Sequence, residues 1–248
     1  MALRIYIKQN NSLKRKMVLN FSYLSLTIGS FLLFWSFYPV ISFEIYSRLF
    51  FQSKTISPVP VSDIVSSLKE ASSVLGSYEI FSNNLKDFTQ AKLWFPTKQQ
   101  EVKNLNTFSV KEYFLSIPKI NISRAKVMVG GEDLAKTLVH YLPTTLPGEY
   151  GNVAIFGHST LPQLYNVKDY KTIFTYLPSL EKGDKVIVYL GDMSYEYEVY
   201  DMFVVKPDKV SVLEQKYDAA YLTLVTCIPP GTAWNRLVIR ARLTKLQS

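Results

Sequence analysis

Two hydrophobic patterns divide this chain. Residues 17–43 contain no charged side chain, whereas from residue 107 onward short apolar runs are separated by polar residues, Gly, Pro and Asn. A bilayer core needs about 20 mostly apolar helical residues, so residues 17–43 are long enough to span one. The pattern therefore predicts one transmembrane helix, followed by a folded domain over residues 107–248.

The pattern of residues 107–248 predicts an all-β fold. Tyr195–Val199 alternates polar and apolar residues with a period of two, as a half-buried strand does. Seven strands are predicted in this region, at residues 109–118, 122–129, 152–158, 185–191, 194–205, 221–227 and 236–243. Short strands at this density are typical of a barrel or a sandwich. We expect two helical interruptions, at Glu132–Val139 and around Thr172–Leu180.

Residues 44–106 lie between these two patterns, and their sequence predicts a stalk followed by a linker. Apolar residues recur at helical spacing over residues 61–88, which indicates a helix with modest packing. Residues 89–106 are rich in Gln, Lys and Asn and are typical of a linker.

The charge distribution supports an anchored protein and argues against a nucleic-acid-binding one. The net charge is +8, but residues 1–16 carry five basic and no acidic side chains, so the remaining surface is nearly balanced. A basic head before an apolar span places residues 1–16 in the cytoplasm and the rest outside. A buried core helix and a cleaved signal peptide are the competing interpretations. The former seldom runs so long without a charge, and the latter needs small residues at its cleavage site.

The single cysteine is the strongest chemical feature. Cys227 closes the apolar run 222–227, and Pro229 and Pro230 must end that strand just beyond it. We therefore expect the thiol to lie at a strand end beside a loop, where a substrate can reach it. Arg236 opens the next predicted strand, and a nearby positive charge favours the thiolate that a nucleophilic cysteine requires. Arg240 and Arg242, on the same face, are expected to be solvated. A buried structural cysteine is the alternative for Cys227, since free cysteines are commonly buried.

Two histidines are available as a base. His158 follows the predicted strand at residues 152–157, where Gly157 lets the chain turn beside the imidazole. His140 has no comparable position at a strand end, so we interpret it as structural. Cys227, His158 and Arg236 together predict an acyl-transfer site.

These motifs resemble those of the sortase family of cell-surface transpeptidases. The resemblance covers Phe108 to Leu243 and keeps the family's order of His, Cys and Arg. Its motifs are Ile117–Ile120, Leu146–Asn152, Asn152–His158, Leu180–Asp184, Thr223–Cys227 and Arg236–Ile239. The fold that it implies is an eight-stranded β-barrel with short helices. The chain shows neither the Asp-Pro-aromatic lid motif nor the second anchor of the pilin-polymerising branch, so we expect a different type.

The resemblance also implies roles for individual residues. Cys227 would form an acyl-thioester, His158 would act as general acid and base, Arg236 would bind the oxyanion, and Thr226 would contact the substrate. The expected substrates are secreted proteins with a Leu-Pro-X-Thr-Gly-like signal, and the expected acceptor is an amine on the cell wall or a surface protein of a bacterium. We expect no metal, no cofactor and no nucleic-acid partner. A hydrolytic cysteine protease and a non-catalytic anchored β-barrel binding module remain the alternatives.

Overall fold

The computed structural model describes residues 12–50, 89–95, 109–141 and 144–247. The chain divides into two compact units, Met1–Ile45 and Tyr46–Ser248. The helical stalk predicted over residues 61–88 and the linker residues 96–106 lie outside the described residues.

The first unit is dominated by one long helix, α1 (Ser12–Phe50). Its segment Arg15–Tyr38 is long and apolar enough to cross a bilayer, and every side chain in this segment is exposed. A helix that is apolar on all sides needs an apolar environment around it, either a protein core or lipid. Within the described residues no protein core surrounds this segment, which agrees with the predicted span at residues 17–43.

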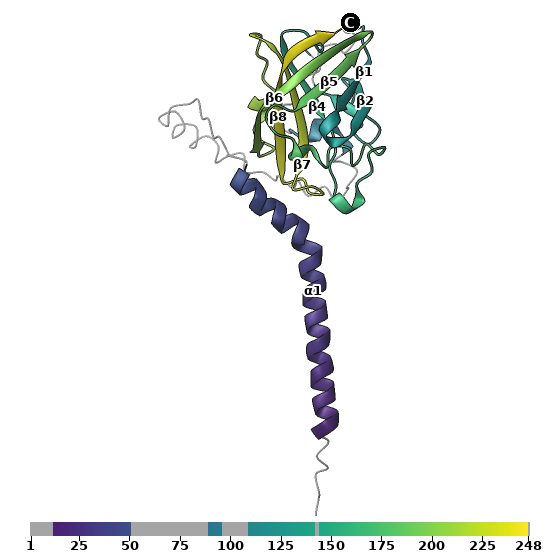
Figure 1. Ribbon diagram of the computed structural model, residues 1–248, viewed down its shortest axis with the longest axis vertical. Coiled ribbons are helices and arrows are strands. Elements are labelled where there is room, and N and C mark those ends of the chain that lie inside the picture. Colours follow the sequence, from purple (N-terminus) through teal and green to yellow (C-terminus); the bar gives the residue numbers. More distant parts are fainter. Residues whose placement is uncertain (1–11, 51–88, 96–108, 142–143, 248) are drawn as a thin grey trace, which may run out of the picture. The chain divides into compact units, whose positions relative to one another are not determined.

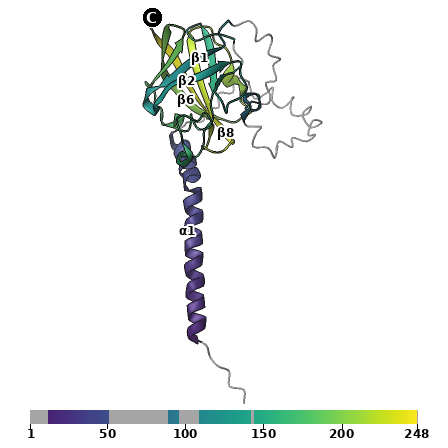
Figure 2. The ribbon, with the colours of Figure 1, turned by 90° about the vertical axis from the view of Figure 1, so that its right-hand side faces the viewer.

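The second unit is a closed barrel of eight strands, so the predicted fold class is confirmed (Figure 1). The order around the barrel is β1-β2-β3-β4-β7-β8-β6-β5. The strands are β1 (Glu112–Ile117), β2 (Ile122–Val129), β3 (Leu138–His140), β4 (Gly151–Phe156), β5 (Lys185–Leu190), β6 (Met193–Val205), β7 (Ala220–Ile228) and β8 (Asn235–Gln247). Single 3₁₀ turns lie at η4 (Ala91–Leu93), η6 (Pro118–Ile120), η7 (Pro162–Leu164), η8 (Leu177–Ser179) and η9 (Val210–Leu213). A second view shows the same barrel from the side (Figure 2).

Strand β7 holds the central position for function, because it lies between β4 and β8. It runs parallel to β4 and antiparallel to β8. Because parallel neighbours end at the same side of a sheet, the residues that follow β4 emerge next to the end of β7. The antiparallel β8 begins at that same place, so three chain segments meet there.

The predicted helix at Glu132–Val139 is wrong. Residues 133–137 form a bridge and turns, and Leu138–His140 forms β3, which pairs in parallel with β2. Leu134, Leu138 and Val139 are all buried, as they would be on one face of a helix. Here Leu134 is buried from a turn, and Leu138 and Val139 are buried from the short strand β3. Around Thr172–Leu180 the chain forms successive turns that include only the 3₁₀ turn η8.

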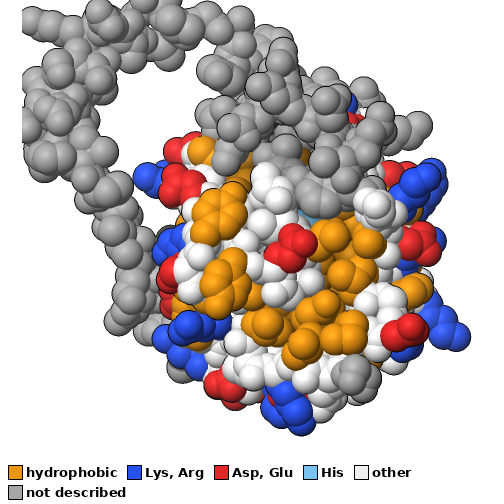
Figure 3. Space-filling view, turned by 90° about the horizontal axis from the view of Figure 1, so that it is seen from above, with side chains coloured by type: hydrophobic (Ala, Val, Ile, Leu, Met, Phe, Trp, Pro, Cys, Tyr) orange, Lys and Arg blue, Asp and Glu red, His pale blue; other side chains and the backbone are white. Residues whose placement is uncertain are grey.

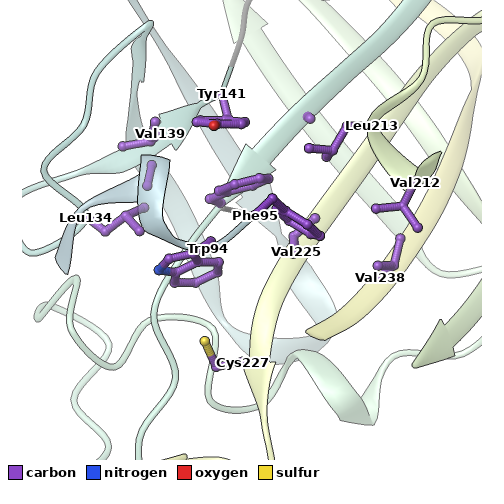
Figure 4. Close-up of a cluster of buried hydrophobic side chains, with 13 residues drawn as sticks. Trp94, Phe95, Leu134, Val139, Tyr141, Val212, Leu213, Val225, Cys227 and Val238 are labelled. Carbon is purple, nitrogen blue, oxygen red and sulfur yellow. The ribbon is translucent and has the colours of Figure 1, made fainter. Parts of the chain in front are cut away.

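The segment Thr89–Phe95, which we expected to be part of a linker, is packed into the domain. Ala91, Trp94 and Phe95 are fully buried in one hydrophobic cluster with side chains of β3, β4, β7 and β8 (Figure 4). The burial of one large apolar side chain contributes roughly 1.5–3 kcal/mol, so the two aromatic rings alone stabilise this attachment substantially. The segment is therefore an integral part of the domain.

Candidate active site

Cys227 and Arg236 are direct cross-strand partners in the β7–β8 ladder. The predicted register is therefore confirmed: the first arginine of β8 lies opposite the thiol. Cys227 is 6% exposed and Arg236 is 2% exposed, so both side chains lie in the interior rather than in an open groove. The sequence had led us to expect a more exposed setting.

The guanidinium of Arg236 is fixed by backbone carbonyls. Its Nη1 donates hydrogen bonds to the Ala233 oxygen at 3.0 Å and to the Asn235 oxygen at 3.2 Å. Its Nη2 donates to the Trp94 oxygen at 3.3 Å. A charged group that is removed from water needs such partners, and these three carbonyls hold the guanidinium in one orientation.

The loop that carries His158 is tied to the end of β7 by three hydrogen bonds. The Gly157 backbone N–H donates to the Val225 oxygen at 3.1 Å, which extends the β4–β7 ladder by one residue. The Thr226 hydroxyl donates to the Gly157 oxygen at 2.8 Å, and the Ser159 hydroxyl donates to the Cys227 oxygen at 2.6 Å. The two chain neighbours of His158, Gly157 and Ser159, are thus both hydrogen-bonded to β7, the strand that carries Cys227.

Gly157 is required here because of close packing. A Cβ atom at this position would lie 2.5 Å from Cδ2 of Phe174 and 2.6 Å from Cδ2 of Leu138, a separation that side chains do not tolerate. Its backbone is not among the positive-φ glycines, so the free turning expected from the sequence is not the reason for glycine. Any larger residue would force Phe174, Leu138 or the His158 loop to shift.

Trp94 contacts two of the three predicted catalytic residues. Its ring centroid lies 5.7 Å from that of His158 in an edge-on arrangement, and the Arg236 Cζ lies 5.2 Å from the Trp94 ring. The indole also stacks on Phe156 with centroids 5.4 Å apart. The Cys227 sulfur points toward Trp94 in the cluster (Figure 4).

Burial sets the protonation states of the two reacting groups. It raises the pKa of the Cys227 thiol, and the positive charge of Arg236 opposes this effect without cancelling it. Burial also lowers the pKa of His158 to about 4, against a smaller opposite effect from the Asp133 carboxylate. At neutral pH the pair is therefore a thiol and a neutral imidazole.

Two buried polar atoms at the site have no hydrogen-bond partner among the described residues, namely His158 Nε2 and Arg236 Nε. Leaving such atoms unpaired in the interior costs about 1–3 kcal/mol each. Both ring nitrogens of His140 and the Tyr113 hydroxyl are unpaired in the same way, so a missing partner does not by itself mark a reaction site. At this site, however, the unpaired atoms belong to side chains beside Cys227 and can be used to hold a reacting carbonyl or proton. The arrangement can thus supply a nucleophile, a proton carrier and an oxyanion donor.

Thr226 does not have the setting that we expected of a substrate-binding residue. Its side chain is fully buried, and its hydroxyl is engaged with the Gly157 oxygen. The structure therefore gives no support for side-chain contact with a substrate. In this arrangement Thr226 connects β7 to the His158 loop.

His140 lies apart from this arrangement, at the end of β3. It is 1% exposed and packs edge-on against Tyr113, with ring centroids 5.9 Å apart. Burial lowers its pKa to about 3, so it remains neutral across the working range. These properties agree with its interpretation as a structural residue.

Three features of the site could not be read from the motifs alone, namely Trp94, Ser159 and the role of Thr226 in connecting β7 to the His158 loop. The pair Trp94-Phe95 within an otherwise polar stretch was the signal that could have identified the buried segment. No group of three His, Cys, Asp or Glu side chains that could share a metal ion occurs in the parts of the chain that the structure describes. Seen from above, the molecule shows hydrophobic side chains gathered beside a small area of histidine surface (Figure 3).

Comparisons with known proteins identify the family of the folded domain. Residues 115–244 match the family model described as Sortase domain. The chain is 30% identical over 130 residues to sortase D of Bacillus subtilis, an alignment that covers 50% of this chain and 60% of that protein. It is 28% identical over 139 residues to sortase A of Bacillus anthracis, covering 56% of this chain and 59% of that protein. It thus spans less than two thirds of the length of either relative.

Among solved structures, the chain is similar to a sortase D5 transpeptidase of Clostridium perfringens. The two are 25% identical with a TM-score of 0.47, and the alignment covers 64% of this chain and 92% of that chain.

Proposed function

Because the chain belongs to the sortase family, we propose that it is a membrane-anchored cysteine transpeptidase of the cell surface. It cleaves a Leu-Pro-X-Thr-Gly-like sorting signal and transfers the acyl part to an amine. The observation that carries this proposal is the meeting of Cys227, Arg236 and the tied His158 loop at the adjoining ends of β7, β8 and β4.

The first half of the reaction forms a thioester. The Cys227 proton passes to His158, and the sulfur bonds to the carbonyl carbon of the scissile peptide. The carbonyl oxygen takes up the electron pair and becomes an oxyanion. Arg236 Nε, a buried donor with no partner among the described residues, donates a hydrogen bond to that oxygen. The His158 imidazolium then gives its proton to the leaving amine as the carbon–nitrogen bond breaks.

The second half reverses these roles. An acceptor amine attacks the thioester carbonyl while neutral His158 takes one of its protons. The carbon–sulfur bond breaks, and the proton returns from His158 to the Cys227 sulfur. The products are a new amide and the enzyme in its starting protonation state, so atoms and protons balance.

The proton transfer from Cys227 to His158 is uphill in this site. The thiol has a raised pKa and the imidazole a lowered one, so the ion pair is a minor form. Interactions that stabilise the pair only in the transition state therefore matter for the rate. Arg236 is the residue placed to provide them, because it lies opposite Cys227.

A structural role for Cys227 accounts for less of the arrangement. A core cysteine needs no charged guanidinium beside it, whereas Arg236 lies opposite Cys227 and is 2% exposed. Burial of such a charge is expensive unless a reaction uses it. This feature favours the transpeptidase over the anchored binding module.

The proposed topology follows from the first unit of the chain. Residues 1–16 lie in the cytoplasm, residues 17–43 cross the plasma membrane of a bacterium, and residues 44–88 lead to the folded domain outside. Secreted proteins with a sorting signal and amines of the cell wall or of surface proteins are then the proposed partners.

The test is to trap the acyl-enzyme. The full-length protein in detergent is incubated with a library of Leu-Pro-X-Thr-Gly-like peptides, and the mass of the intact protein is measured. We expect one acyl adduct on Cys227, which is the only cysteine, and none on the variant Cys227→Ala. An adduct that persists in Cys227→Ala, or none in the parent, would refute the proposal. Product analysis with and without an added amine separates transfer from hydrolysis.

A further inference from the structure

We propose that Trp94 is a positioning residue of this reaction, which holds the Arg236 guanidinium and the His158 ring in their working orientations. The inference rests on the proposed function, because it gives Trp94 a part in the chemistry of Cys227. It adds to that function a segment outside residues 115–244, the part that matches the family model.

Trp94 is itself held firmly in place. Its segment is bonded to the turn that follows β2: the Ala91 N–H donates to the Glu132 oxygen at 3.0 Å, and the Leu134 N–H donates to the Thr89 oxygen at 2.9 Å. These two hydrogen bonds flank a bridge between Gln90 and Asp133. A side chain can orient a neighbour only when its own backbone is fixed, and this condition is met here.

Side-chain packing fixes the segment from its other face. Phe95 and Trp94 both contact Phe156, which is the last residue of β4. The Trp94 and Phe156 rings are nearly parallel, at 15°. The strand that leads to His158 and the segment that carries Trp94 are therefore packed directly against each other.

The contact with Arg236 is made by both parts of Trp94. The backbone oxygen accepts a hydrogen bond from Nη2, and the indole ring lies over the guanidinium with Cζ 5.2 Å from its centroid. A cation above an aromatic face is attracted by the ring, more strongly when water is excluded. Since Nη1 is held by Ala233 and Asn235, Trp94 supplies the remaining restraint that leaves Nε free to donate.

The contact with His158 acts on the proton carrier. The indole lies edge-on against the imidazole. We expect this contact to restrict rotation of the imidazole and to keep water from the face that it covers. The charged groups that act on His158 are Asp133, on the turn bonded to the Trp94 segment, and Asp169 and Lys171, on the loop beyond His158. Of these three residues, only Asp133 is also bonded to the segment that carries Trp94, through its bridge to Gln90.

The experiment compares three variants of the full-length protein in detergent, with the same peptide and amine. Trp94→Ala removes the ring, Trp94→Phe keeps an aromatic ring, and Leu93→Ala is the matched control because this neighbour is 40% exposed. We expect Trp94→Ala to lower kcat by about 10- to 100-fold, as misplaced catalytic groups do, with a smaller change in KM. Trp94→Phe should recover most of that loss, and Leu93→Ala should match the parent.

A second readout separates positioning from packing alone. Without the indole, the His158 ring gains water, so the acid limb of kcat/KM should move toward the ordinary histidine range near about pH 6.5. Loss of packing alone would lower the melting temperature without moving this limb. The melting temperature of each variant is recorded for that reason.

Three results would overturn the inference, and a fourth concerns the proposed function instead. A higher kcat/KM and faster alkylation of Cys227 in Trp94→Ala would show that Trp94 is a removable cover. Equal losses in Trp94→Phe and Trp94→Ala with an unmoved acid limb would show a packing role only. Parent-like kinetics of Trp94→Ala would show no role at all. By contrast, a parent that forms no acyl-enzyme refutes the proposed function, whatever the Trp94 variants do.

Discussion

Arg236 lies directly opposite Cys227 across the β7–β8 ladder, and both side chains are withdrawn from water. An arginine beside a thiol favours the thiolate, whereas burial disfavours it, and here burial has the larger effect on the pKa of Cys227. The guanidinium is therefore not needed to keep a resting thiolate. Its position suits it better to stabilise charge that develops during the reaction.

This relationship gives the first prediction, on Arg236→Ala. Removal of one oxyanion donor costs about 100- to 1,000-fold in kcat, and we expect a loss of kcat/KM in this range. The same change should lower stability, because it empties a large buried site and leaves the Ala233, Asn235 and Trp94 carbonyls without this donor.

Arg240→Ala is the control for that prediction. Arg240 pairs with Thr223, four residues before the nucleophile, and lies over Phe203 with Cζ 5.0 Å from the ring. Kinetics with a fixed peptide and thermal unfolding measure both variants. A greater loss of activity in Arg240→Ala than in Arg236→Ala would contradict the register-based assignment.

A second prediction compares two threonines of β7. Thr226→Val removes the hydroxyl that donates to the Gly157 oxygen, and Thr223→Val removes the one that donates to Asn152 Oδ1 at 2.7 Å. Each change should lower the free energy of unfolding by about 1–3 kcal/mol, since a buried acceptor loses its donor. Only Thr226→Val should lower kcat, by roughly 10-fold, because it loosens the His158 loop.

Denaturant unfolding and kcat measured on both threonine variants check this prediction. A Thr226→Val protein with parent kcat would mean that the loop is held well enough by the Ser159 hydroxyl and the Gly157 N–H. A large rise in KM without a change in kcat would restore the substrate-binding role expected from the sequence.

The all-β class and the pairing of Cys227 with Arg236 could be predicted because both depend on local pattern, whereas the eight-stranded barrel was implied only by the resemblance to the sortase family. Alternation of side chains identifies the strands, and a short loop between β7 and β8 fixes which residues face each other. The position of His158 was also predictable, because an apolar strand ends directly before it.

Two features could not be predicted because they depend on distant contacts. The strand Leu138–His140 is too short to show alternation and is defined by its parallel partner β2. The segment Thr89–Phe95 lies within a polar stretch of the sequence. Only the hydrophobic cluster that it forms with β4, β7 and β8 explains the presence of Trp94 and Phe95 in this stretch. Burial of the site, which sets both pKa values, depends partly on this cluster.

A third prediction concerns the anchor. Deletion of residues 1–43 should release the protein from membranes and leave the barrel folded, because Met1–Ile45 and the remainder form separate compact units. Sedimentation of membranes before and after deletion measures the first effect. Protease added to intact cells should digest the barrel of the full-length protein. A protected barrel would mean that the orientation is inverted.

The last prediction concerns the dependence of kcat/KM on pH. Burial lowers the pKa of His158 to about 4 and raises that of Cys227, so the two limbs of the bell move apart. Below the acid limb the base is already protonated while the thiol is not ionised. Above the alkaline limb the thiolate exists without the acid that expels the amine.

Between the limbs the competent ion pair is a small and nearly constant fraction, so we expect a slow enzyme with a broad optimum through neutral to mildly alkaline pH.

The same pKa shifts make the stability of the fold depend on pH. In the unfolded chain His158 and His140 bind protons at about pH 6.5, whereas in the folded protein their lowered pKa values keep both imidazoles neutral at this pH. The free energy of unfolding should therefore fall as pH falls from there toward about 4, where His158 also becomes protonated in the folded protein. Circular dichroism at each pH separates a true acid limb from unfolding. His158→Ala should abolish the bell with most of the activity, and His140→Gln should leave its limbs in place. An acid limb near pH 6.5 in the folded parent would contradict the prediction that burial lowers the pKa of His158.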